Sequence, residues 1–134
     1  MMKIQDGSIM PGVGIGNIKL NMTKDQLIGL IGNDFKESLL GRGTRIEIEN
    51  AKFWVSEDGK IYQIGVENDF KGKYKGIIGI GSTLSEVKKI IGNYVQVYDT
   101  YEIEKEKGIC FELEDIDDWN PLIAPIEYIY VFRI

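Results

Sequence analysis

The residues best suited to chemistry in this sequence are carboxylates, and they gather in one stretch of its second half. Positions 99–118 hold nine acidic side chains and two lysines. Concentrated charge of one sign selects partners of the opposite sign and raises their association rate. We therefore predict an acidic docking surface for a basic partner protein, made of Glu102, Glu104, Glu112, Glu114, Asp115, Asp117, Asp118 and Trp119.

Other interpretations of the acidic stretch stay open. It is also compatible with a solvated strand face followed by a loop, which is how most runs of charge are used. The alternating acids between Glu112 and Asn120 resemble a calcium-binding loop, but they lack its central glycine and flanking helices. A carboxylate pair for glycoside hydrolysis is available as well, although acid pairs are common in any acidic chain. We expect no metal here.

The composition excludes several kinds of catalytic site. The 134 residues include no histidine and one cysteine, so neither a Ser-His-Asp nor a Cys-His set is possible, and nor is the usual zinc site. Cys110 has no disulfide partner, and its apolar neighbours favour a buried thiol. The glycines of Gly12–Gly16 lack the strand and helix that frame a dinucleotide-binding loop. We therefore expect no cofactor and no enzymatic activity.

The net charge of −5 belongs to the second half of the chain. Residues 1–75 hold 11 basic and 10 acidic side chains, whereas residues 76–134 hold 5 and 11. Binding to nucleic acid rests on neutralising phosphates, so an acidic chain is poorly suited to it. No stretch approaches the roughly 20 apolar residues of a membrane span, and polar residues interrupt the N-terminal segment where a signal peptide would be apolar. We expect a cytoplasmic protein that binds neither nucleic acid nor membranes.

The aromatic residues add candidates for a binding surface. Trp119 lies among acids in a predicted loop, where it serves either as a plug beneath the loop or as an interface anchor. One of Phe53 and Trp54 must face away from the core if their strand is regular. In the last predicted strand, three aromatic residues share one face, which suits either packing or binding; they are Tyr128, Tyr130 and Phe132.

An internal repeat at an offset of 60 residues defines the elements that position these side chains. The segment Ile18–Asn33 aligns without gaps on Ile78–Asn93. Each copy predicts a short helix with a capping box at its start, one apolar face and a glycine that ends it. The residues in these roles are Thr23 and Gln26, Leu27, Leu30, Ile31 and Gly32 in the first copy, and Thr83 and Glu86, Val87, Ile90, Ile91 and Gly92 in the second.

Period-two patterns and turn signals predict three strands after each helix. Because helices of about ten residues need a surface to pack against, we predict an α+β fold of two tandem helix-plus-antiparallel-meander repeats, with the helices packed on one face of an antiparallel sheet. A single domain would span residues 1–134, with the repeats at about 14–67 and about 74–134. The predicted strands are 44–49, 51–56 and 60–67, then 94–103, 108–114 and 125–132.

The segment Gly14–Leu27 (GIGNIKLNMTKDQL) carries a family resemblance. Together with the helix-plus-meander repeat, it resembles the units of β-lactamase inhibitor protein and of small outer-membrane assembly lipoproteins. It is also similar to immunity proteins of contact-dependent inhibition and other polymorphic toxin systems. The lipoproteins would need a lipid-modified cysteine near the start, which this sequence lacks.

The immunity-protein resemblance agrees with the charge pattern. It implies a bacterial protein that binds a cognate toxin domain, a basic nuclease, and neutralises it by steric and electrostatic blockade of its active site. The alternative is an extracytoplasmic enzyme inhibitor or structural module of the β-lactamase-inhibitor type.

Overall fold

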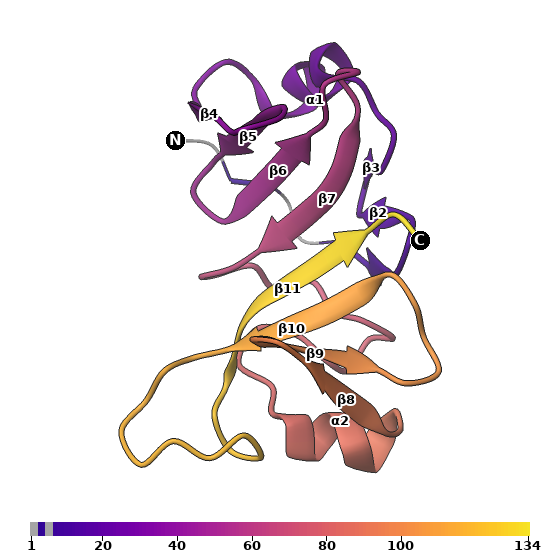
Figure 1. Cartoon of the computed structure of the whole chain (residues 1–134), viewed down its shortest axis with the longest axis vertical. Helices are drawn as coiled ribbons and strands as arrows, with labels where there is room; N and C mark the ends of the chain where they lie inside the picture. The colour runs from indigo at the N-terminus through magenta and orange to yellow at the C-terminus, as the bar shows by residue number, and fades with distance from the viewer. Residues whose placement is uncertain (1–2, 5–6) are drawn as a thin grey trace.

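The computed structural model describes residues 3–4 and 7–134, which form eleven strands and two short helices (Figure 1). Within these residues, no helix has the length and apolar character needed to cross a membrane. The elements are β1 (Ile9–Met10), β2 (Gly14–Ile15), β3 (Ile18–Lys19), α1 (Lys24–Ile31), β4 (Lys36–Leu39), β5 (Thr44–Glu47), β6 (Ala51–Val55), β7 (Ile61–Val66), α2 (Leu84–Ile90), β8 (Tyr94–Val97), β9 (Thr100–Ile103), β10 (Ile109–Leu113) and β11 (Ile126–Phe132).

Eight of the strands form one antiparallel sheet in the order β4-β5-β6-β7-β11-β10-β9-β8. The first half of the chain supplies β4 to β7 and the second half supplies β8 to β11. The two sets meet where β7 pairs with β11, so the last strand of the chain lies at the centre of the sheet (Figure 1). Strands β1, β2 and β3 form a separate small sheet, and β2 contacts β11.

Alternation along the central strands separates a core face from an open face. In β6, Phe53 is fully buried whereas Trp54 is half-buried on the opposite side, as the sequence required of one of them. In β11, Ile129 and Val131 face the core, and Tyr128 and Tyr130 alternate with them. We call the side of the sheet that carries Trp54 and Tyr130 the open face.

The predicted helix starts are confirmed. In both α1 and α2 the threonine hydroxyl accepts from the backbone N–H three residues later, and that residue's side chain accepts from the threonine backbone N–H. Gly32 ends α1 with a φ of 82°, which only glycine adopts readily. The predicted apolar faces are partly wrong, because Leu30 and Ile90 are exposed.

The predicted fold class, two helix-plus-meander repeats with helices packed on one face of the sheet, is wrong. The chain is mostly antiparallel sheet, and α1 and α2 have only 8 and 7 residues. Each helix buries two side chains, and the two lie at opposite ends of the molecule's long axis (Figure 1). Non-helical segments supply much of the remaining core, including Ile9, Ile15, Ile18, Phe70, Tyr74 and Ile78.

The strand count was also underestimated. Each helix is followed by four strands, not three. Strand β4 is polar and exposed at an edge of the sheet, so it carries no alternation to reveal it. The predicted strand 94–103 is in fact the hairpin β8–β9, which turns at Tyr98 and Asp99; Tyr98 has a φ of 56°, unusual for a residue other than glycine.

Candidate functional site

A pocket of about 380 Å³ lies on the open face, over the strands where the two halves of the sheet meet. It combines two carboxylates with large aromatic rings, so it offers both negative charge and flat apolar surface. Its lining residues are Trp54, Gln63, Thr100, Glu102, Cys110, Glu112, Tyr130 and Phe132. We call this site the open-face pocket.

Strand register brings these residues together from distant parts of the chain. Cys110 in β10 stands opposite Glu102 on one side and opposite Tyr130 on the other. The Tyr130 hydroxyl donates to Glu112 Oε1 at 2.8 Å. Because side chains at i and i+2 share a face of a strand, Glu112 follows Cys110 into the pocket. The sheet therefore holds the carboxylate of Glu112 in place beside Tyr130.

The aromatic rings of the pocket meet over a glycine. Trp54 and Tyr130 pack edge to face, with ring centroids 5.9 Å apart, and Tyr128 stacks on Tyr130 at 5.7 Å. A Cβ at Gly65 would lie 2.9 Å from ring carbons of Tyr130 and 3.3 Å from Trp54. Gly65 thus leaves the space that the Tyr130 ring occupies, and glycine inside a strand is a known signal of such close approach.

The surroundings of the pocket are electrostatically negative. Partial desolvation, followed by the charges of Glu112, Glu114 and Glu67, raises the pKa of Glu127. A carboxyl is harder to ionise when other carboxylates surround it. The carboxylates of Glu112, Glu114 and Glu67 thus lie close enough to Glu127 to act on it, and this grouping along β10 and β11 favours a cation.

The protein itself places a cation, Lys52, on this face. Lys52 Nζ lies 5.0 Å from the centre of the Tyr128 ring and 3.6 Å from a carboxylate oxygen of Glu67. An ammonium between an aromatic face and a carboxylate gains both cation–π and ion-pair attraction. The open face thus accommodates a basic side chain between an aromatic ring and a carboxylate, and the neighbouring pocket offers the same two kinds of group.

The groups of the pocket that could act as nucleophiles are held in their neutral forms. Burial, followed by the charge of Glu102, raises the pKa of Cys110 to about 12. Desolvation and the hydrogen bond to Glu112 raise the pKa of Tyr130 as well. A protonated thiol is a poor nucleophile. In the part of the chain that the structure describes, no group of three or more carboxylates and cysteine is arranged to hold a metal ion.

The structure does not bring all eight predicted site residues together. Glu102 and Glu112 line the open-face pocket, and the charge of Glu114 acts on the neighbouring Glu127. Glu104 is exposed in the turn between β9 and β10. The remaining four lie exposed in the loop between β10 and β11, which extends away from the sheet (Figure 1); they are Asp115, Asp117, Asp118 and Trp119.

Sequence reasoning missed several residues that complete the pocket. Gln63, Thr100 and Cys110 were not predicted to belong to it, and Trp54 and Tyr130 were not connected to the acidic stretch. Alternation within a strand predicts which side chains point outward. It does not predict that β7 pairs with β11, and this pairing brings the outward side chains of the two halves together. A glycine among the apolar residues of β7 was the available signal for a close approach at Gly65.

No protein-family model matches this sequence, and no curated protein sequence matches it. The structure is similar to the crystal structure of the uncharacterized protein yfeY from Escherichia coli, with a TM-score of 0.59 and 11% sequence identity. The match covers 97% of this chain and 100% of that chain. Likeness at this identity establishes a shared fold.

Proposed function

We propose that this chain is a non-enzymatic immunity protein that binds a basic, nuclease-type toxin domain and blocks its active site. The observation that carries the proposal is the convergence of Glu102 and Glu112 beside Trp54 and Tyr130 on the outward side of the sheet. Interface anchors are enriched in aromatic residues and arginine. A lysine or arginine of the toxin would enter the open-face pocket, with its charge against the two carboxylates.

The proposal relies on binding chemistry because the pocket is poorly equipped for catalysis. The pKa values of Cys110 and Tyr130 are raised, not lowered, so the pocket activates neither group as a nucleophile near neutral pH. The sequence offers no histidine to activate them. Rings and carboxylates fixed by the sheet lose little conformational freedom when a partner binds, which favours affinity.

Electrostatics supports a nuclease as the partner. Nucleases bind phosphates through basic residues, and an acidic face competes for the same positive surface. Such a partner would be neutralised in the cytoplasm, where its nucleic-acid substrate lies. The net charge of −6 over residues 76–134 would add long-range attraction to the contacts in the pocket.

The proposal is tested by co-expressing the chain with the toxin domain encoded beside its gene. We expect the two proteins to co-purify and the chain to protect cells from that toxin. Failure of both, with the toxin active and the chain folded, contradicts the proposed function.

Matched variants then locate the contact. Glu112→Gln keeps an acceptor for the Tyr130 hydroxyl but removes the charge, so we expect a loss of affinity of about tenfold or more. A triple variant with Asp115→Asn, Asp117→Asn and Asp118→Asn should mainly slow association and weaken its salt dependence. If the triple variant abolishes binding while Glu112→Gln leaves it unchanged, the contact lies in the loop between β10 and β11 and the open-face assignment is wrong.

A further inference from the structure

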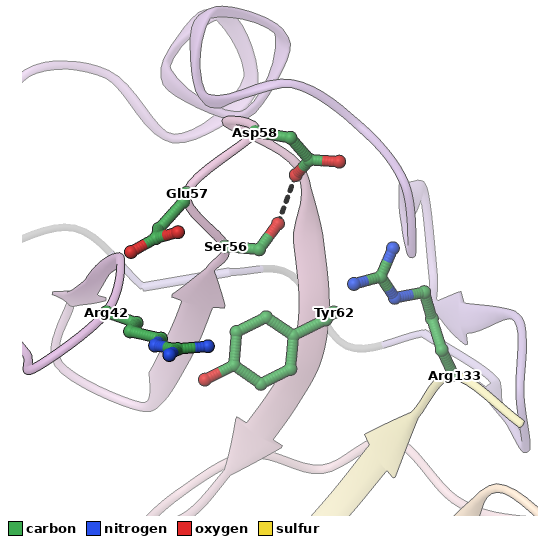
Figure 2. A pocket seen from close by; sticks show the side chains of 6 residues that line it. All are labelled: Arg42, Ser56, Glu57, Asp58, Tyr62 and Arg133. Atoms are coloured by element: carbon green, nitrogen blue, oxygen red, sulfur yellow. Dashed lines mark hydrogen bonds between the residues drawn. The ribbon is translucent and has the colours of Figure 1, made fainter.

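A second pocket, of about 430 Å³, lies beside the turn that joins β6 to β7 (Figure 2). Two arginines from distant parts of the chain reach it, with the Tyr62 ring between them (Figure 2). Its residues come from the turn between β4 and β5, the turn between β6 and β7, strand β7 and the C-terminal segment; they are Arg42, Ser56, Glu57, Asp58, Tyr62 and Arg133.

A bulge in β7 places Tyr62 in this pocket. Trp54 pairs with Gln63 and Val55 pairs with Ile61, so Tyr62 is an extra residue without a partner in β6. Bulges change the direction in which a side chain points and are frequent at functional sites. The Tyr62 ring is thereby separated from the regular alternation of the sheet and forms a surface between the arginines.

Arg133 is held in place by an uncharged amide and an aromatic ring. Its backbone N–H donates to the carbonyl of Tyr62 at 3.1 Å, and its Nη1 donates to Asn21 Oδ1 at 3.0 Å. The guanidinium carbon lies 5.9 Å from the centre of the Tyr62 ring. The amide oxygen and the ring orient the guanidinium but carry no formal charge, so neither of them neutralises it.

The two arginines of the pocket differ from the third arginine of the chain. Arg45 Nη2 forms an ion pair with Glu47 at 3.0 Å. Among the residues that the structure describes, Arg42 and Arg133 have no carboxylate oxygen within 4.0 Å. Guanidinium groups present a planar set of donors that fits carboxylates and phosphates. The two arginines without an ion pair in the described part of the chain, Arg42 and Arg133, both line this pocket.

Two carboxylates of the pocket, Asp58 and Glu57, act on the positive charge of the arginines in different ways. Asp58 accepts from the Ser56 hydroxyl and, at 3.2 Å, from the backbone N–H of Lys60. These donors, the Ser56 hydroxyl first, lower the pKa of Asp58, and the charges of Lys60 and then Arg133 add to the effect. Its charge is therefore already engaged by the turn. Glu57 is exposed on the same turn, and its charge would weaken the attraction of the pocket for an anion.

We infer that Arg42 and Arg133 form a binding site for an oxyanion, the carboxylate or phosphate group of a small ligand, held beside Tyr62. The site is separate from the open-face pocket, and no residue lines both. It needs no toxin to be detected, so its test is independent of the proposed function.

The site is tested by titrating the ¹⁵N-labelled full chain with inorganic phosphate, and in a second arm with acetate, at constant ionic strength. We expect saturable chemical-shift changes in the side-chain N–H signals of Arg42 and Arg133, with the paired Arg45 as the internal reference. Saturation by phosphate alone identifies a phosphate site, and saturation by both identifies a general oxyanion site. Linear shifts, or equal shifts of Arg45, would overturn the inference.

Three substitutions in the pocket and one control outside it sharpen the result. Arg42→Gln and Arg133→Gln should each weaken binding by about fivefold or more, because each removes one fork of donors. Glu57→Gln should strengthen it by about threefold, because it removes a repelling charge. Lys89→Gln, on the exposed side of α2, makes the same net-charge change as the arginine variants and should leave affinity unchanged. Arginine variants that bind like Lys89→Gln contradict the assignment.

Discussion

At the scale of single residues, Gly65 determines how the rings of the open face are arranged. It stands opposite Tyr130 in the β7–β11 pair, and the Tyr130 ring occupies the space where another residue's Cβ would be. The Trp54 ring closes over the same position. The aromatic surface of the open-face pocket therefore depends on glycine at position 65, which has no side chain to displace the rings.

We predict that Gly65→Ala destabilises the protein by about 1–3 kcal/mol, because the added methyl group forces the Tyr130 ring from its position. Urea unfolding followed by tryptophan fluorescence measures the change. Gly29→Ala is the control: Gly29 lies in α1 with open space around it, and alanine there should stabilise by about 0.5–1 kcal/mol. Equal effects of the two substitutions would contradict the role given to Gly65.

Cys110, in the same pocket, makes the stability of the protein depend on pH. The folded protein raises the pKa of its thiol from 9.0 to about 12. Between these values the unfolded chain loses the proton and the folded chain keeps it, so the free energy of unfolding falls as pH rises. The stability that the neutral thiol contributes is fully present below pH 9 and is lost toward pH 12.

We therefore predict that Cys110→Ala reduces the loss of stability between about pH 8 and about pH 10.5 by about 1–2 kcal/mol. Urea unfolding of the wild type and the variant at both pH values isolates the thiol from the tyrosines, which titrate in both proteins. Identical pH dependence in the two proteins would show that Cys110 is not shielded in the folded state.

At the scale of elements, each helix is held by a capping box at its start and by two buried apolar side chains. Leu27 and Ile31 are buried in α1, and Leu84 and Val87 in α2, whereas Leu30 and Ile90 are exposed. Helices of two turns are marginal by themselves. The caps satisfy backbone donors that the first turn leaves free.

We predict that Thr23→Ala and Thr83→Ala each lower the free energy of unfolding by about 1 kcal/mol, because each removes a hydroxyl acceptor at a helix start. Thermal or urea unfolding measures the loss. Ser85→Ala is the control within α2, because Ser85 is exposed, and it should change stability by less than about 0.5 kcal/mol. Threonine variants as stable as Ser85→Ala would show that the caps contribute little.

At the scale of the whole molecule, the β7–β11 pair joins the two halves into one sheet. Ile129 and Val131 stand opposite Val66 and Ile64, and all four are fully buried. Their strands come from different halves of the sequence, so the core continues across the junction. Folding of either set of four strands is thus coupled to the other.

We predict that Ile129→Val lowers the free energy of unfolding by about 0.5–1.5 kcal/mol, and that the loss is shared by both halves. Native-state hydrogen exchange should show equal decreases in protection for amides of β6 and β10. Ile123→Val, in the exposed loop between β10 and β11, is the matched control and should change neither. A decrease confined to β10 would contradict a shared cooperative core.

Local chemistry was predictable where it depends on neighbours in the chain. The capping boxes, the glycine that ends α1 and the opposite orientations of Phe53 and Trp54 follow from spacing alone, because helix and strand periods are local. The split of strand 94–103 was not predictable in the same way, because a turn with Tyr98 at positive φ has no glycine to mark it.

The candidate site was only partly predictable for the same reason. Glu102 and Glu112 were identified by the density of negative charge, but so were Asp115, Asp117 and Asp118 in the loop. Composition counts charges along the chain and does not distinguish a strand face from a loop. Only strand register places the first two carboxylates beside Trp54, which lies far away in the sequence.

By itself, the sequence determined the chemistry available to this protein: it has no histidine, one cysteine and an acidic second half, and Thr23 and Thr83 specify the helix starts. The tertiary structure alone decided how that chemistry is assembled. Pairing of β7 with β11 is a contact between segments separated by about half the chain, and its free energy comes from burial shared by both partners. Local sequence patterns do not specify this pairing. The open-face pocket and the pocket of Arg42 and Arg133 therefore form only when the sheet is complete.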